Sequence, residues 1–169
     1  DEAISSNIAS INSAKCYAEK AALAGNFDEE LHGLDYLMYA YLQKGDNQLA
    51  LQQLNYIKQD IKSVSAQNLK VAYAYAAIPS RYMLENRNWS EAAKLILFPA
   101  DMPWEKFPWQ KGIVTFTRLM GKVNTGDIEG ARRELNQLAI LHNELVQQKD
   151  IYKAKQLEVQ LQTGRAWIE

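Results

Sequence analysis

The stretch of residues 34–54, LDYLMYAYLQKGDNQLALQQL, predicts two helices joined by a short turn. Before the turn, large apolar residues recur at the spacing of one helical stripe: Leu34, Leu37, Met38 and Tyr41. Gly45 is suited to end the first helix, and Asp46 is suited to cap the second. After the turn the helical spacing resumes at Ala50, Leu54 and Ile57. A small alanine among leucines indicates a place where two antiparallel helices cross closely.

The joint between these helices recurs along the chain. Residues 43–51, QKGDNQLAL, match residues 124–132, NTGDIEGAR, and residues 85–93, ENRNWSEAA, form a looser copy without the glycine. In the looser copy we expect Asn88 and Glu91 to form an N-cap and capping-box pair. The copies follow one another at steps of 47, 42 and 39 residues, centred on Ala3, Ala50, Ala92 and Ala131. Self-similarity of this period predicts a helical repeat array.

The sequence predicts an all-α fold in which residues 1–169 form a single helical-repeat domain. The expected helices cover residues 2–23, 29–44, 46–60, 65–86, 90–97, 106–124, 127–148 and 151–168. Most of them group into pairs at about 29–60, 65–97 and 106–148, and the last is expected to be a capping helix with one polar face. Pro79 falls inside an expected helix, where it removes one backbone hydrogen bond. The chain opens on DEAI, which looks like the start of a second helix, so we expect a piece of a longer array.

The joint resembles that of the tetratricopeptide repeat. The best copy matches that family's pattern at Leu34, Leu37, Tyr41, Gly45, Ala50 and Leu54. Met38 and Ile57 replace small residues of the pattern, and the spacing exceeds the family's usual period, so the repeats are degenerate. The chain is also similar to the C-terminal half of a group of uncharacterised bacterial tetratricopeptide proteins, through residues 32–45, 76–93 and 126–135. The resemblance implies a right-handed α–α superhelix and a longer parent protein, and it brings no known activity. It leaves open whether the protein is located in the bacterial cytoplasm or in the periplasm.

Composition restricts the class of function. The chain has 19 basic and 20 acidic residues, so nothing indicates a nucleic-acid-binding face. No apolar run is long enough to span a membrane. The one cysteine, Cys16, cannot form an internal disulfide, and the two histidines, His32 and His142, do not stand at metal-ligand spacing. We therefore expect no enzymatic activity of the chain itself, no cofactor and no metal.

The candidate binding residues come from the resemblance, because the inner surface of a tetratricopeptide array is lined by fixed positions of each first helix. Carried over, these positions are His32, Asp35, Tyr39, Leu42 and Gln43 in the best copy, with Arg81 and Glu85 in the next. His32, Asp35 and Tyr39 share a helical face and together offer groups that donate, accept and titrate near neutral pH. The alternative is that His32 and Asp35 only cap and solvate a helix.

Arg81 and the tyrosines near it have two interpretations. Arg81 suits a carboxylate or phosphate of a ligand, or else an intramolecular ion pair such as one with Glu85. Tyrosines at helical spacing are more often packing residues than recognition residues, although tyrosine-rich grooves suit peptides. Those in question are Tyr73, Tyr75 and Tyr82.

Residues 97–112, LFPADMPWEKFPWQKG, form the one irregular stretch. Its prolines interrupt any continuous helix. Trp104 and Trp109 then either form a lid or partner patch, or seal the gap between widely spaced repeats, which we favour.

The leading hypothesis is a non-catalytic interaction scaffold that binds a protein or peptide in its concave groove. One alternative is a parent protein that binds a small molecule or metal, or acts as an enzyme, through a site completed by missing N-terminal helices. Another is a homo-oligomerisation module held together by exposed tryptophans. No nucleic-acid partner and no membrane insertion are expected.

Overall fold

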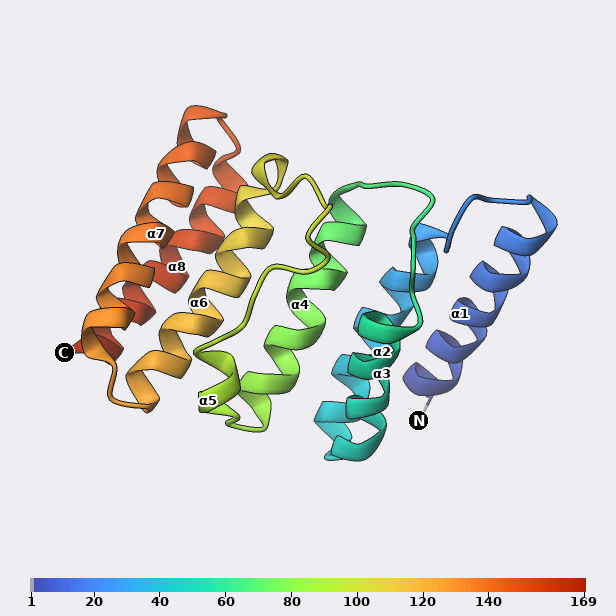
Figure 1. Cartoon of the computed structure of the whole chain (residues 1–169), viewed down its shortest axis with the longest axis horizontal. Coiled ribbons are helices and arrows are strands. Elements are labelled where there is room, and N and C mark those ends of the chain that lie inside the picture. Colours follow the sequence, from blue (N-terminus) through green and yellow to red (C-terminus); the bar gives the residue numbers. More distant parts are fainter. Residues whose placement is uncertain (1) are drawn as a thin grey trace. The chain divides into compact units, whose positions relative to one another are not determined.

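The computed structural model describes residues 2–169 as helices joined by loops (Figure 1). Within these residues there is no strand, only an isolated bridge between Asn26 and Val64. The all-α class is thus confirmed. The helices are α1 (Glu2–Lys20), α2 (Asp28–Lys44), α3 (Asn47–Gln59), α4 (Leu69–Glu85), α5 (Trp89–Ala92), the 3-10 helix η1 (Trp104–Lys106), α6 (Pro108–Asn124), α7 (Ile128–Gln147) and α8 (Ile151–Ile168).

The chain divides into two compact units, one that extends to Tyr82 and one from Met83 to Glu169. The predicted single domain and the predicted superhelix remain predictions. None of the helices within residues 2–169 has the length and apolarity of a membrane span.

In the first unit, α2 packs against both α1 and α3 (Figure 1). The predicted joint forms as expected: Gly45 takes the left-handed conformation with φ 77°, and the carboxylate of Asp46 accepts a hydrogen bond from the Leu49 N–H at 3.1 Å. Ala50 is fully buried. The predicted core stripe of α2 is buried along its length at Leu34, Leu37, Met38 and Tyr41.

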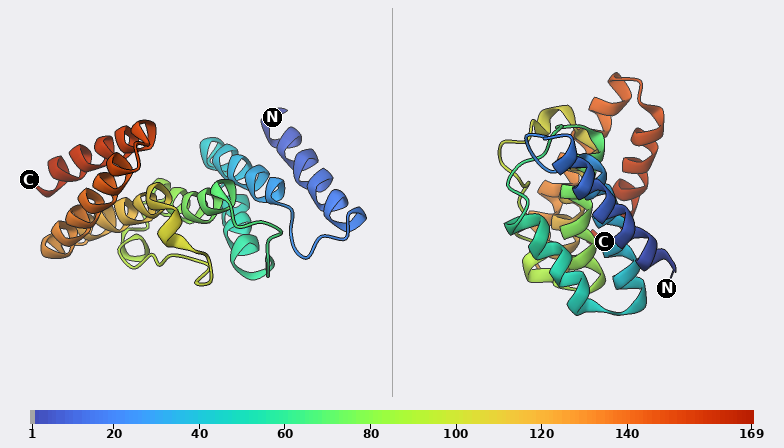
Figure 2. Two further views of the ribbon diagram at one scale, coloured as in Figure 1. Left: turned by 90° about the horizontal axis from the view of Figure 1, so that it is seen from above. Right: turned by 90° about the vertical axis from the view of Figure 1, so that its right-hand side faces the viewer.

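In the second unit, α6 packs against α7 and α8 (Figures 1 and 2). Its joint repeats that of the first unit, because Gly126 has φ 81° and Asp127 accepts a hydrogen bond from the Gly130 N–H at 2.8 Å. The capping helix α8 buries one side and leaves Ile151 and Trp167 about half exposed. The core of this unit includes Leu119, Ala131, Leu138, Leu141, Leu145, Leu157 and Leu161.

Two expected helices differ from those observed by more residues than the others do. The segment expected at 90–97 is helical only over Trp89–Ala92, and the backbone then closes shorter i→i+3 bonds on the way to Pro99. Asn88 holds the N-cap position there, but its side chain makes no capping hydrogen bond. The helix expected from residue 65 begins at Leu69, because the side chain of Asn68 accepts hydrogen bonds from the backbone N–H groups of Lys70 and Val71.

Three of the four aligned alanines, Ala50, Ala92 and Ala131, are fully buried. Ala3 is exposed on α1, and its place in the repeat alignment remains a prediction. The close approach of α1 and α2 falls at Gly33 of α2, where an added Cβ would lie 2.7 Å from the Ile11 side chain.

Candidate functional site

A groove between α2 and α4, within the first unit, collects four of the predicted site residues. His32, Asp35 and Tyr39 come from α2 and Arg81 from α4. We call it the tyrosine groove; its volume is about 330 Å³, and its lining is His32, Asp35, Tyr36, Tyr39, Tyr73 and Arg81. The residues of α2 follow the i, i+3, i+4, i+7 spacing, so they share one face of the helix. That face lies opposite the buried stripe of α2.

Polar contacts join the start of α4 to the start of α2, and they hold the two helices together at this end of the groove. The side-chain amide of Asn68 donates to the Asp28 carboxylate at 2.6 Å, and the Lys70 ammonium lies 3.2 Å from the same carboxylate. Asp28 is buried, so these contacts compensate a carboxylate that has little access to water.

Arg81 and Asp35 form the central polar contact of the groove. The guanidinium of Arg81 donates to the carboxylate of Asp35, and more weakly to its backbone oxygen at 3.3 Å. A second nitrogen of Arg81 donates to the Tyr73 hydroxyl at 2.9 Å. Only 4% of Asp35 is exposed. Arg81 is therefore in an intramolecular ion pair, with Asp35 in place of the Glu85 partner considered from the sequence.

Burial has the largest effect on the pKa of two groups in the groove, the Asp35 carboxyl and the Tyr73 phenol. Desolvation raises the pKa of Asp35, and the positive charges of Arg81 and His32 offset that effect only in part. Burial likewise raises the pKa of Tyr73, with Arg81 acting in the opposite direction. At neutral pH the groove therefore presents Tyr73 as a neutral phenol beside a fixed guanidinium.

Aromatic rings form the walls of the groove. Tyr36 and Tyr39 are 52% and 51% exposed. The rings of His32 and Tyr36 meet edge to face with centroids 5.0 Å apart. The guanidinium carbon of Arg81 lies 5.8 Å from the ring centroid of Tyr39 and also 5.8 Å from that of Tyr73. Arg81 is thus placed between two aromatic rings, a geometry that favours cation–π attraction.

Sequence reasoning missed two lining residues of the groove. Tyr36 stands one helical turn after His32, and this i+4 spacing was the signal that could have found it. Tyr73, for which both packing and recognition were left open, lies half buried in the groove, whereas Tyr75 is buried as packing requires.

Other predicted site residues lie elsewhere. Gln43 and Glu85 are exposed near the ends of α2 and α4 and do not line the groove. Trp104 is buried, with its indole N–H donating to the Pro99 oxygen at 2.9 Å. Trp109 is half buried against the core of the second unit. Trp104 is therefore not an exposed lid or partner patch, and Trp109 is partly covered by the core against which it packs.

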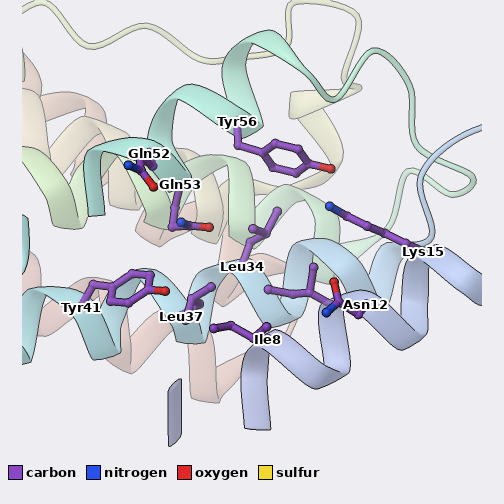
Figure 3. A pocket seen from close by; sticks show the side chains of 10 residues that line it. Ile8, Asn12, Lys15, Leu34, Leu37, Tyr41, Gln52, Gln53 and Tyr56 are labelled. Carbon is purple, nitrogen blue, oxygen red and sulfur yellow. The ribbon is translucent and has the colours of Figure 1, made fainter. Parts of the chain in front are cut away.

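A second cavity lies on the opposite face of α2, between α1 and α3, with a volume of about 320 Å³ (Figure 3). We call it the aliphatic slot. Its apolar floor is formed by Ile8, Ile11, Leu34, Leu37 and Tyr41. Asn12 from α1 and Gln52 and Gln53 from α3 supply polar groups at its walls.

One end of the aliphatic slot is closed by a satisfied polar network. Lys15 and Tyr56 point toward one another there (Figure 3), with the ammonium 4.5 Å from the ring centroid. The fully buried Glu30 accepts hydrogen bonds from the Tyr56 hydroxyl at 2.6 Å and from the Asn26 amide at 2.8 Å, and Lys15 lies 3.7 Å from it. These contacts tie α1, α2 and α3 together, so the network has a structural explanation.

Within residues 2–169, no group of three or more His, Cys, Asp or Glu side chains is arranged to hold a metal ion. His32 and Asp35 share the tyrosine groove, but the carboxylate of Asp35 is engaged by Arg81. The chemistry that the groove offers is hydrogen bonding and aromatic contact.

Comparison of the chain with protein-family models finds no match, and comparisons with curated proteins and with solved structures find none either. The tetratricopeptide resemblance therefore remains a prediction. What can be said of function rests on the groove itself.

Proposed function

We propose that this chain is a non-catalytic interaction module that binds a segment of a protein or peptide in the tyrosine groove. The observation that carries the proposal is the position of Arg81 between the rings of Tyr39 and Tyr73, held by the buried carboxylate of Asp35. Tyrosine and arginine dominate the energetics of protein interfaces. A guanidinium already fixed in place loses little conformational entropy on binding.

Exposure and charge support a binding role over a catalytic one. Tyr36 and Tyr39 present about half of their surface to solvent, which leaves ring faces for a partner. Asp35, the carboxylate of the groove, is buried and engaged by Arg81, so it is poorly placed as a general base. An aromatic wall beside a guanidinium that is held in place suits recognition of a segment whose side chains pack against it.

We also propose that the helix pairs are degenerate tetratricopeptide-like units of a superhelix. The proposal is supported by the repeated glycine–aspartate joints at Gly45 and Gly126, each followed by a capping aspartate. It is further supported by the fully buried alanines Ala50 and Ala131 that follow the two joints. In that arrangement the tyrosine groove would belong to the inner surface.

Selection from a library of random short peptides displayed on phage tests the binding proposal. The wild-type chain is compared with a Tyr36→Ala/Tyr39→Ala variant, which removes exposed rings without unpairing the buried Asp35. We expect peptides that are enriched on the wild type and lost on the variant. A Tyr152→Ala variant is the matched control, since Tyr152 is 71% exposed on α8 in the other unit.

Thermal unfolding followed by circular dichroism would verify that both variants stay folded. Equal enrichment on the wild type and on the folded groove variant would contradict the proposal, and so would the absence of any enrichment.

A further inference from the structure

The polar groups that face the tyrosine groove can all donate hydrogen bonds, and of these Arg81 can only donate, whereas the tyrosine hydroxyls and a neutral imidazole can also accept. Within residues 2–169, the hydroxyls of Tyr36 and Tyr39 make no hydrogen bond to the protein, so both are available to donate. The carboxylate of Asp35 accepts only, but it is buried and already receives a hydrogen bond from Arg81. Arg81 and both hydroxyls can therefore donate to a ligand, while the one group that can only accept is turned inward.

This imbalance selects among peptide ligands. An ordinary extended peptide presents an N–H and a carbonyl at each residue, so a groove that holds it must supply acceptors as well as donors. Proline has no backbone N–H. A proline-rich segment in the polyproline II conformation presents unpaired carbonyls and makes no internal hydrogen bonds. The backbone of such a segment therefore needs only hydrogen-bond donors from the groove that binds it.

The walls of the groove suit the same ligand. Proline rings pack against flat aromatic faces, and aromatic-lined grooves are the usual receptors for polyproline II segments. Tyr36 and Tyr39 stand about one turn apart on α2, and Tyr73 faces them from α4. His32 packs edge to face on Tyr36 and restrains that ring. The groove therefore offers aromatic faces in defined positions with hydroxyl donors beside them.

Charge also bears on the ligand. Arg81 is paired with Asp35, so the centre of the groove carries opposite charges that offset one another. A strongly acidic peptide would have to compete with Asp35 for the guanidinium. An uncharged segment can instead accept a hydrogen bond from Arg81 without breaking the ion pair, because a guanidinium has five N–H donors.

We infer that the segment bound in the tyrosine groove is an uncharged, proline-rich peptide in the polyproline II conformation, whose carbonyls accept hydrogen bonds from the tyrosine hydroxyls and Arg81. The inference rests on the proposed function and names the chemistry of its partner.

Titration of the isotopically labelled chain with blocked peptides of equal length tests the inference. The probes are an oligoproline, a glycine–serine peptide and an oligoglutamate, each followed by amide chemical shifts and by calorimetry. We expect the oligoproline to bind at least about tenfold more tightly than the other two, with shifts confined to the groove face of α2 and to α4. Tyr39→Phe keeps the ring and removes one donor, so we expect it to weaken oligoproline binding by about 2- to 12-fold, the range for one hydrogen bond.

Tyr39→Ala should weaken binding further, and Tyr152→Phe on α8 should leave it unchanged. Equal binding of all three peptides, with the same dependence on Tyr39, would overturn the proline inference and leave the proposed binding function standing. So would oligoproline shifts that map to the aliphatic slot. If no probe binds although the phage selection yields groove-dependent peptides, the inference alone fails; if both experiments fail, the proposed function falls with it.

Discussion

The two units share the same helix joint, but they compensate a buried carboxylate differently. In the second unit, Glu134 accepts a hydrogen bond from Arg118 at 2.9 Å and another from Lys122 at 2.8 Å. In the first unit, Asp35 has one cationic partner, Arg81, with His32 contributing only at longer range. Burial acts to raise the pKa of both acids. For Glu134 the two cations outweigh it and the pKa is lowered, whereas for Asp35 burial prevails and the pKa is raised.

This difference in pKa distinguishes Glu134, which makes a structural contact, from Asp35, which belongs to the candidate site. Glu134 on α7 is well matched by two cations on α6, so its ionised form is favoured and the contact fastens two helices. Asp35 is less well matched, so its ionised form is disfavoured, yet it holds Arg81 beside the exposed Tyr39 and the half-buried Tyr73. Groups whose environment works against their charge cluster at functional sites. The predictions below address this contrast.

Removal of the arginine partner of a buried carboxylate should have the largest effect on the free energy of unfolding. The effect should be greater in the first unit than in the second. Arg81→Met leaves the Asp35 carboxylate buried without its cation, and breaking a buried pair in this way costs about 3–5 kcal/mol of unfolding free energy. For Arg81→Met we expect a loss of about 3 kcal/mol, because 29% of the Arg81 side chain is exposed and water can replace part of the contact. Arg118→Met should cost less, since Lys122 remains on Glu134. Urea denaturation of both variants provides the comparison.

The double variant Asp35→Asn/Arg81→Met is the control for that measurement. It removes the stranded charge as well as the arginine, so it should be more stable than Arg81→Met alone. If Arg118→Met proved as destabilising as Arg81→Met, the distinction between a doubly and a singly compensated carboxylate would have to be abandoned.

The shared joint predicts a smaller effect that should be alike in the two units. Ala50→Leu and Ala131→Leu each place a large side chain at a fully buried position, which should cost about 1–3 kcal/mol through overpacking. Ala3→Leu is the matched control, because Ala3 is exposed on α1 and should tolerate the change. Midpoints of thermal or denaturant unfolding would measure all three. A variant at Ala50 as stable as the wild type would argue against a close helix crossing there.

Local patterns predicted the all-α class and most of the helices. Helical periodicity and the glycine–aspartate turns fixed the positions of α2, α3, α7 and α8 to within a few residues, because both signals depend on neighbours along the chain. The same periodicity placed His32, Asp35 and Tyr39 on one face of α2. The expected helix at 90–97 was too long, since its continuation depends on how the chain turns toward Pro99.

The pairing within the site depended on tertiary packing and could not be predicted. Asp35 and Arg81 are 46 residues apart in sequence, and the nearer Glu85 was the natural choice of partner for Arg81. The burial of Trp104 could not be predicted either, because its neighbours in sequence do not distinguish a tryptophan that fills a core from one that faces a partner. Trp104 is 7% exposed, and its indole N–H donates to the Pro99 oxygen.

The smallest predicted effect concerns pH and has opposite signs for the two acids. A raised folded-state pKa means that the contribution of Asp35 is fully present below its ordinary pKa of 3.8 and is lost as pH rises through the folded-state value. A lowered folded-state pKa means that the contribution of Glu134 is present above its ordinary pKa of 4.5 and is lost as pH falls through the folded-state value. Relative to the wild type, Asp35→Asn should therefore become more stable as pH rises from about 3 to about 7, and Glu134→Gln less stable. Unfolding free energies of the three proteins across this range give two difference curves, and slopes of the same sign would show that the two carboxylates are compensated alike.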